Sequence, residues 1–244
     1  MGRKVPRKRI HDDGSNVVEM FPPQKRKKWS HHDLQNVKAL NHNQGDFLEG
    51  WFSGNNVCAV GSAGTGKTFL AVYSALCSVL DERDPVQRLV IIRSAVETRK
   101  IGHLPGTIEE KQEVFELPYK DVCASLMGRE ATYQDMKDAR KIEFMLTSHI
   151  RGLTWDNVVV VIDEAQNMNF HEINSIMTRL GNNSRVIIVG DTKQSDLAGG
   201  EKEGLSQAIK VLQQISNTTL VPFTSDDIVR SGFVKSWIKA CEQL

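Results

Sequence analysis

The segment GSAGTGKT (Gly61 to Thr68) has the residue types and spacing of a phosphate-binding loop. It matches the pattern G-x-x-x-x-G-K-S/T and lies between a strand-like segment and an apolar helix-like segment, the context that the motif needs. Its small residues let backbone N–H groups surround phosphates, and the following helix adds the positive end of its dipole. We expect Lys67 to contact the β- and γ-phosphates, and Thr68 to contact Mg²⁺. The predicted nucleotide-binding residues here are Gly61, Ser62, Ala63, Gly64, Thr65, Gly66, Lys67, Thr68 and Phe69.

Two carboxylates follow the longest apolar run of the chain. The run Val158 to Ile162 delivers Asp163 and Glu164 to one edge of a buried sheet, where ligands bind in open α/β folds. Asp163 is predicted to complete the Mg²⁺ site with Thr68. Glu164 is predicted to polarise a water molecule for attack on the γ-phosphate, which a hydrolase needs. The alternative is a surface Asp-Glu pair that only caps a strand.

A glutamine follows another buried segment, in VIIVGDTKQSD (Val186 to Asp196). A guanine-reading motif, Asn/Thr-Lys-x-Asp, would need Asp where the chain has Ser195. A D-x-x-G switch is also missing after Asp163, so the pattern disfavours a GTPase. Gln194 is therefore predicted to be a sensor that hydrogen-bonds the γ-phosphate or its attacking water. The alternative is a polar turn after Gly190 without a functional part.

These residues need a scaffold of alternating strands and helices. From about Trp29 onward, near-continuous Val/Ile/Leu segments alternate with helix-like ones, which predicts one α/β domain with a mostly parallel sheet and helices on both faces. The predicted strands are 56–60, 88–93, 142–147, 158–163, 185–190 and 219–223. The predicted helices are 66–80, 119–140, 171–180, 205–215 and 225–242.

Composition limits the class of protein. The 244 residues are 40% hydrophobic and 25% charged, as expected of a globular protein with one sizeable core. The longest apolar run is too short to span a bilayer, so neither membrane insertion nor secretion is expected. Four cysteines, at positions 58, 77, 123 and 241, show no metal or disulfide spacing, which fits a reducing cytoplasm.

The net charge of +1 conceals a basic N-terminus. Residues 1–30 contain nine Lys/Arg and three Asp/Glu, a local charge of +6. We expect residues 1–28 to form a disordered arm that could neutralise nucleic-acid phosphates, and residues 29–244 to form the nucleotide-binding domain. A solubilising tail is an equally good interpretation of the arm.

Several motifs together resemble one known family. GSAGTGKTFLA, DEAQN, GDTKQSD, RSAVETRKIGHLPG (Arg93 to Gly106) and DDIVRSGFVK (Asp226 to Lys235) occur in the order found in PhoH-like, phosphate-starvation-inducible ATPases, which are P-loop proteins related to superfamily 1 helicases. The resemblance runs from about Gln44 to Lys235. It implies a single RecA-like domain, ATP and Mg²⁺ as ligands, and a cytoplasmic location in a bacterial cell or a phage-infected bacterium.

The resemblance also implies roles for residues that mean little on their own. Gln44, in the polar segment NHNQ, matches the glutamine that helicase relatives use to recognise adenine, and a side-chain amide offers the donor and acceptor for this. Arg151 and Arg230 match arginines of the family pattern and are candidate catalytic residues. A loop after the second strand corresponds to a nucleic-acid contact in helicase relatives, and its candidate residues are Arg93, Thr98, Arg99 and Lys100.

The sequence thus predicts a Mg²⁺-dependent ATP hydrolase that couples hydrolysis to RNA or single-stranded DNA. One alternative is a nucleotide-dependent binding or assembly factor in which hydrolysis is only a timer. A second is a P-loop kinase, which Glu164 disfavours. Two-domain relatives supply transition-state arginines from their other lobe, so we also expect a homo-oligomer, such as a hexameric ring, with Arg230 completing a neighbour's site and Arg151 as second candidate.

Overall fold

The computed structural model describes residues 29–94, 108–150, 152–191, 197 and 203–241. Their core is a six-stranded sheet in the order β3-β2-β4-β5-β1-β6, in which every pair of neighbours is parallel. The six predicted strands are confirmed, each within a residue or two at its ends. The strands are β1 (Asn56–Gly61), β2 (Arg88–Arg93), β3 (Ile142–Leu146), β4 (Val158–Ile162), β5 (Arg185–Gly190) and β6 (Thr218–Phe223).

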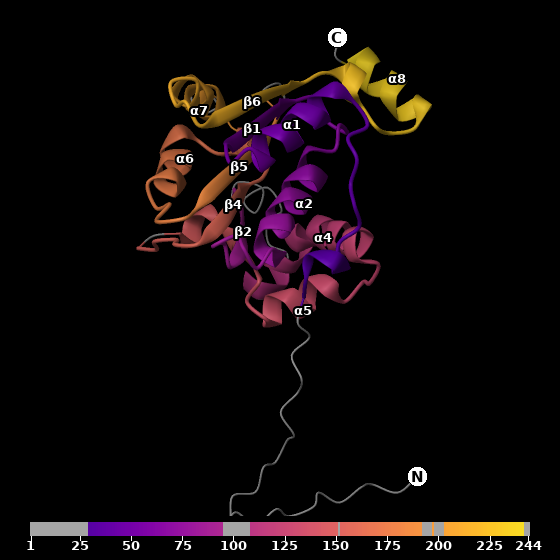
Figure 1. Cartoon of the computed structure of the whole chain (residues 1–244). Helices are drawn as coiled ribbons and strands as arrows, with labels where there is room; N and C mark the ends of the chain where they lie inside the picture. The colour runs from indigo at the N-terminus through magenta and orange to yellow at the C-terminus, as the bar shows by residue number, and fades with distance from the viewer. Residues whose placement is uncertain (1–28, 95–107, 151, 192–196, 198–202, 242–244) are drawn as a thin grey trace, which may run out of the picture.

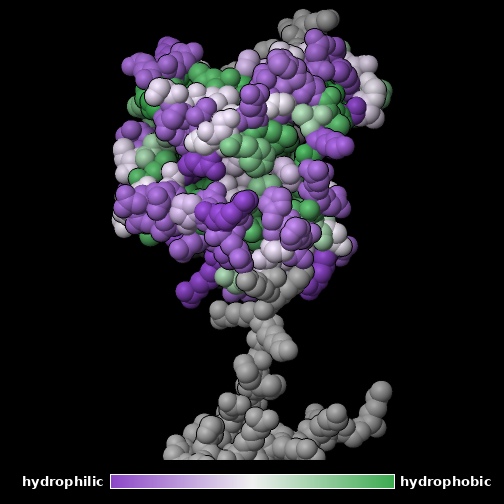
Figure 2. All heavy atoms as spheres, viewed as in Figure 1, coloured by the Kyte–Doolittle hydropathy of each residue, from purple (hydrophilic) through white to green (hydrophobic). Residues whose placement is uncertain are grey.

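Helices cover both faces of the sheet, which confirms the RecA-like α/β architecture (Figure 1). Alternate residues of each strand point to opposite faces, so Val159 and Val161 of β4 pack in one core while Val158, Val160 and Ile162 pack in the other. The outer surface in the same view is mainly hydrophilic (Figure 2). The helices are α1 (His42–Phe52), α2 (Lys67–Leu80), α4 (Ile108–Met127), α5 (Thr132–Asp138), α6 (Phe170–Met177), α7 (Gly204–Leu212) and α8 (Gly232–Cys241).

Helix α1 is not among the helices that the sequence predicts, and it contains Gln44 of the polar segment NHNQ. Asn41 caps the helix by accepting a hydrogen bond from the Gln44 backbone N–H at 2.9 Å. Phe47 and Trp51 lie one turn apart and are fully buried. Two glycines in an 11-residue helix lower its intrinsic propensity, so tertiary burial of this aromatic stripe stabilises the helix.

Two other helix predictions are corrected at their boundaries. The helix predicted over 119–140 is two helices, because Gly128 adopts a φ of 67° after α4 and ends it. The helix predicted over 225–242 begins only at Gly232, because the Thr224 hydroxyl accepts from the Asp226 N–H and the Asp227 carboxylate bonds back to Thr224. The chain from Ile228 to Ser231 is consequently not helical, and it passes along the phosphate-binding loop.

Candidate nucleotide-binding site

The phosphate-binding loop connects β1 to α2 at the carboxyl edge of the sheet. Gly61 has a φ of 127°, and a Cβ atom there would lie 1.8 Å from the carbonyl oxygen of Phe223 in β6. Only glycine therefore lets the loop leave β1 while β6 stays paired beside it. Gly66, with a φ of 88°, then turns the chain into α2.

The loop carbonyls are bonded to the surrounding fold. Lys67 Nζ donates to the carbonyl oxygens of Gly61 and Ser62, each at 2.7 Å. The Val229 N–H donates to the Gly64 carbonyl at 3.0 Å, and Gln44 Nε2 donates to the Thr65 carbonyl at 2.9 Å. A loop whose carbonyls are engaged in this way can present its N–H groups to an anion, as the motif predicts.

The two predicted metal ligands are in direct contact. Thr68 Oγ1 donates to Asp163 Oδ1 at 2.9 Å, although the residues are 95 positions apart in the chain. Hydroxyl and carboxylate oxygens are donors that Mg²⁺ prefers, and Mg²⁺ usually completes its shell with phosphate oxygens and water. Within the described part of the chain, no group of three or more His, Cys, Asp or Glu side chains could hold a metal alone. The donor set fits a Mg²⁺ ion that binds together with a nucleotide.

Glu164 lies next to this pair in an unusual backbone conformation. Its φ of 51° and ψ of 44° are left-handed, which is uncommon for a residue with a Cβ atom. Gln166 Nε2 donates to Glu164 Oε2, while Gln166 Oε1 accepts from the Asp191 backbone N–H at 3.0 Å. One amide side chain thus joins the ends of β4 and β5 and orients the Glu164 carboxylate. Gly190 permits this approach, since a Cβ there would lie 2.9 Å from Gln166 Oε1.

Three carboxylates act electrostatically on the Lys67 ammonium group. Burial lowers the pKa of Lys67, while Asp191, Glu164 and Asp163 oppose this by favouring its charged form. Asp191 has the largest opposing effect and is itself buried at the end of β5. In the sheet, β5 lies between β1, which leads into the phosphate-binding loop, and β4, which leads into Asp163, so Asp191 follows the strand between them.

A cavity of about 550 Å³ joins these groups. Lys67, Thr68, Asp163 and Glu164 line it, together with Arg93 from the end of β2, Pro118 of α4 and Arg230. The Arg93 guanidinium carbon lies 5.7 Å from the ring centroid of Phe115 in α4. Arg93, predicted as a nucleic-acid contact, is thereby placed on the wall of the phosphate cavity.

A smaller cavity of about 250 Å³ adjoins the outer side of the loop. Leu40, Gln44, Phe69, Val229 and Arg230 contribute to its walls. Its walls also include Lys38, and their apolar side chains with the Gln44 amide suit the face and edge of a nucleobase. In this structure Gln44 Oε1 accepts a hydrogen bond from the Leu40 N–H at 2.9 Å. The oxygen and the nitrogen of the amide are therefore both hydrogen-bonded to backbone groups, of Leu40 and Thr65.

Arg230 lies against the loop of its own chain, and its predicted role in a neighbour's site stays a prediction. A Cβ built at Gly64 would lie 3.2 Å from Arg230 Cγ, and Arg230 lines both cavities. The non-helical chain after the Thr224 turn causes this, because it returns the segment to the loop before α8 begins. The other predicted site residues lie outside the described residues, namely Gln194, Arg151, Thr98, Arg99, Lys100 and the arm 1–28.

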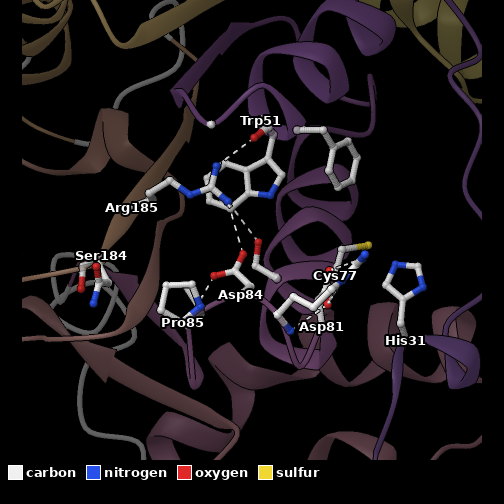
Figure 3. Close-up of a pocket in the computed structure, with 14 residues that line it drawn as sticks. His31, Trp51, Cys77, Asp81, Asp84, Pro85, Ser184 and Arg185 are labelled. Atoms are coloured by element: carbon white, nitrogen blue, oxygen red, sulfur yellow. Dashed lines mark hydrogen bonds and ion pairs between the residues drawn. The ribbon is translucent and has the colours of Figure 1, made fainter.

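A wider hollow of about 800 Å³ lies at the opposite, amino-terminal edge of the sheet (Figure 3). Arg185, at the start of β5, places its guanidinium 3.7 Å from the ring centroid of Trp51. It also donates to the Trp51 carbonyl at 2.8 Å and to Ser78 Oγ at 3.1 Å. These contacts bind the end of α1 and the end of α2 to β5, and we interpret the cluster as a structural anchor.

Two further findings concern the described residues as a whole. Cys58, Cys77 and Cys123 are buried free thiols, and burial raises the pKa of Cys58 to about 12 and that of Cys77 to about 11. No described helix is both long and apolar enough to cross a membrane.

Sequence reasoning missed three residues of the site. Gln166 stands two positions after Glu164 in the DEAQN motif, so its place in the motif could have indicated it. Asp191 follows β5 as Asp163 follows β4, and carboxyl ends of parallel strands meet at one edge. Tyr119 of α4 donates its hydroxyl to Asp163 Oδ2, a contact that no local pattern shows.

Comparisons with known proteins agree with the motifs. A model of the family described as PhoH-like protein matches residues 36–242. The PhoH-like proteins of Mycobacterium tuberculosis H37Rv and Bacillus subtilis 168 are 34% and 30% identical over 84% and 86% of this chain, and Protein PhoH of Escherichia coli K12 is 32% identical over 85%. The chain spans 57%, 65% and 59% of the lengths of these three relatives.

Among solved structures, the large terminase of a thermophilic bacteriophage overlaps with a TM-score of 0.49 at 13% identity, over 83% of this chain and 50% of that one. This likeness is too distant to bear on activity. The family match extends from the segment before α1 to the last helix, and the motifs within it form one site at the carboxyl edge of the sheet. The chain therefore belongs to the PhoH-like protein family.

Proposed function

We propose that the protein is a Mg²⁺-dependent ATP hydrolase that couples hydrolysis to RNA or single-stranded DNA in a bacterial or phage-infected cytoplasm. The observation that carries the proposal is the meeting of Lys67, Thr68, Asp163 and Glu164 on one cavity wall. These residues come from two segments about a hundred positions apart, and each has the chemistry that phosphoryl transfer to water needs.

The hydrolytic step depends on Glu164. A carboxylate oriented by the Gln166 amide can accept a proton from a water molecule as that water attacks the γ-phosphate. Lys67 would exchange its bonds to the loop carbonyls for phosphate oxygens and neutralise the charge that develops there. Thr68 and Asp163 would hold the Mg²⁺ ion, which supplies further charge neutralisation when bound. A kinase must exclude water from this position, so a fixed Glu164 favours the hydrolase.

Coupling to nucleic acid rests on the family resemblance and on where β2 ends. The segment after Arg93, which contains Thr98, Arg99 and Lys100, begins at the wall of the phosphate cavity. A ligand that contacts Arg93 would lie close to the reacting phosphate. The basic arm 1–28 could add phosphate contacts of its own.

The test is the rate of phosphate release from ATP with no polymer, with single-stranded RNA and with single-stranded DNA. Full-length protein and protein lacking residues 1–28 are compared, and Glu164→Gln serves as the inactive control. We expect Glu164→Gln to bind ATP normally and to lose about 10²- to 10⁴-fold in turnover, because an amide cannot accept the proton. Lys67→Ala should weaken binding itself.

The outcomes separate the alternatives. Stimulation by one polymer supports coupling, and loss of that stimulation without residues 1–28 assigns it to the arm. Hydrolysis that no polymer stimulates favours the timer of an assembly factor. Normal turnover by Glu164→Gln would overturn the assignment of the base, and transfer of phosphate to an acceptor other than water would favour the kinase.

The active form is proposed to be a homo-oligomer. Helix α8 exposes Phe233, Val234 and Trp237, whose relative accessibilities are 78%, 38% and 64%, beside the segment that carries Arg230. Apolar side chains grouped on an exposed helix suit a subunit contact. The position of Arg230 against its own loop favours a contact with the nucleotide of the same subunit.

A further inference from the structure

Tyr119 belongs to the buried face of α4. Phe115, Tyr119 and Cys123 follow one another at intervals of four residues, and all three lie in the core. The ring of Tyr119 packs 5.9 Å from that of Phe144, measured between centroids. A phenylalanine would fill this space equally well, so packing alone does not explain the hydroxyl.

The hydroxyl reaches the predicted metal ligand. Tyr119 Oη donates to Asp163 Oδ2 at 2.6 Å, while Asp163 Oδ1 accepts from Thr68 Oγ1 at 2.9 Å. Asp163 has a relative accessibility of 3%, and a buried carboxylate needs a donor for each oxygen. One donor, Thr68, lies at the end of the phosphate-binding loop, and the other, Tyr119, belongs to α4. These two hydrogen bonds together fix the plane of the Asp163 carboxylate.

Tyr119 is a phenol, which can donate one hydrogen bond, and its acceptor here is Asp163 Oδ2. Carboxylates that hold metals are commonly oriented by such donors, and loss of one typically weakens metal binding 10- to 100-fold.

We propose that Tyr119 is a positioning residue for Asp163, holding Oδ2 so that Oδ1 remains beside Thr68 to receive Mg²⁺. This inference rests on the proposed function, because it assumes that a metal–nucleotide complex binds here. The inference implies that α4, which carries none of the sequence motifs, contributes to metal affinity through Tyr119.

The experiment compares the natural protein with Tyr119→Phe. Tyr133→Phe is the matched control: Tyr133 is also fully buried, lies in α5 and has Glu116 rather than Asp163 as its carboxylate neighbour. Binding of Mn²⁺ is measured by the electron paramagnetic resonance of the free ion, in the presence of a non-hydrolysable ATP analogue. Affinity for the analogue at saturating metal and the unfolding temperature are measured on the same three proteins.

We expect Tyr119→Phe to weaken Mn²⁺ binding by at least tenfold, with analogue affinity at saturating metal within about twofold of the natural protein. Tyr133→Phe should bind Mn²⁺ normally. Equal Mn²⁺ affinity in all three proteins, or an equal loss in both variants that follows their loss of stability, would overturn the inference and leave the proposed function intact. Absence of metal-dependent nucleotide binding in the natural protein would overturn both.

Discussion

At the scale of single residues, amide side chains organise much of the site. Gln166 joins Glu164 to the backbone of Asp191, and Gln44 joins the start of α1 to the carbonyl of Thr65. An amide can donate and accept at once, which lets one side chain hold two segments in register. In both places the amide is buried, so its removal would leave backbone or carboxylate groups without a partner.

Gln44→Ala should narrow the preference for ATP over GTP. Loss of a base-reading amide typically costs about 1 to 3 kcal/mol, or roughly 5- to 150-fold in relative affinity. Asn41→Ala is the control, because it removes the cap of α1, at a cost of about 1 kcal/mol in stability, and retains the amide. The two nucleotides are compared by calorimetric titration. If the natural protein binds both equally, Gln44 does not select adenine.

The residue types of the site could be predicted from the sequence where a motif fixes their spacing. Lys67 and Thr68 belong to one contiguous pattern, and Asp163 follows an apolar run that only a buried strand explains. Tyr119 could not be predicted, because its hydroxyl meets Asp163 across 44 positions and α4 has no distinctive pattern. The contact of Arg230 with the loop of its own chain could not be predicted for a similar reason, since a turn at Thr224 returns the segment to the loop.

At the scale of elements, β6 supports the phosphate-binding loop through its backbone. It pairs with β1 in parallel over six positions, as far as Gly61 opposite Phe223. The Ser62 N–H then donates to the Phe223 carbonyl at 3.2 Å, so the first turn of the loop rests on the end of β6. The six strands were predictable because near-continuous Val/Ile/Leu runs are typical of strands buried on both faces. Helix α1 was not predictable, because its two glycines obscure the helical spacing of its apolar residues.

Gly61→Ala should therefore lower the free energy of unfolding much more than Gly54→Ala does. Both glycines have positive φ, 127° and 91°, so each substitution carries a backbone strain of about 1 to 2 kcal/mol. Only at Gly61 does the new Cβ atom also meet a backbone oxygen, at 1.8 Å, while nothing lies within 4 Å of the corresponding atom at Gly54. Urea unfolding of both variants measures the difference. If both variants lost the same free energy of unfolding, the end of β6 would be able to move away from the new Cβ atom at no cost in stability.

At the scale of the whole molecule, the described residues form one sheet, and the chain spans less than two thirds of the length of each relative compared with it. Every described group of the candidate site lies in this one sheet, in the helices beside it or in the segments that connect them. A subunit contact through α8 would bring a second copy close to Arg230, so the arginine could serve either its own nucleotide or that of a neighbour.

Mixing two inactive variants distinguishes these two arrangements. Arg230→Ala retains its base, and Glu164→Gln retains its arginine. Because Arg230 lies against Gly64 of its own chain, we expect mixtures that co-assemble to show no more ATPase activity than the separate variants. Co-assembly is checked by co-purification of differently tagged copies. Recovery of activity on mixing would show that the arginine acts between subunits, where it contributes roughly 10³- to 10⁵-fold in rate.

The backbone at Glu164 has a consequence for the evolution of this site. Four described residues other than glycine have positive φ, and two of them, Asn157 and Asn183, are of a type that tolerates it. Glycine in place of exposed Arg140, another of the four, would relieve strain without touching the site. Glycine at 164 would relieve similar strain but remove the carboxylate. Selection for thermal stability alone would therefore favour glycine at 164. A glutamate there agrees with the proposed role of its carboxylate, at a stability cost of the order of 1 kcal/mol.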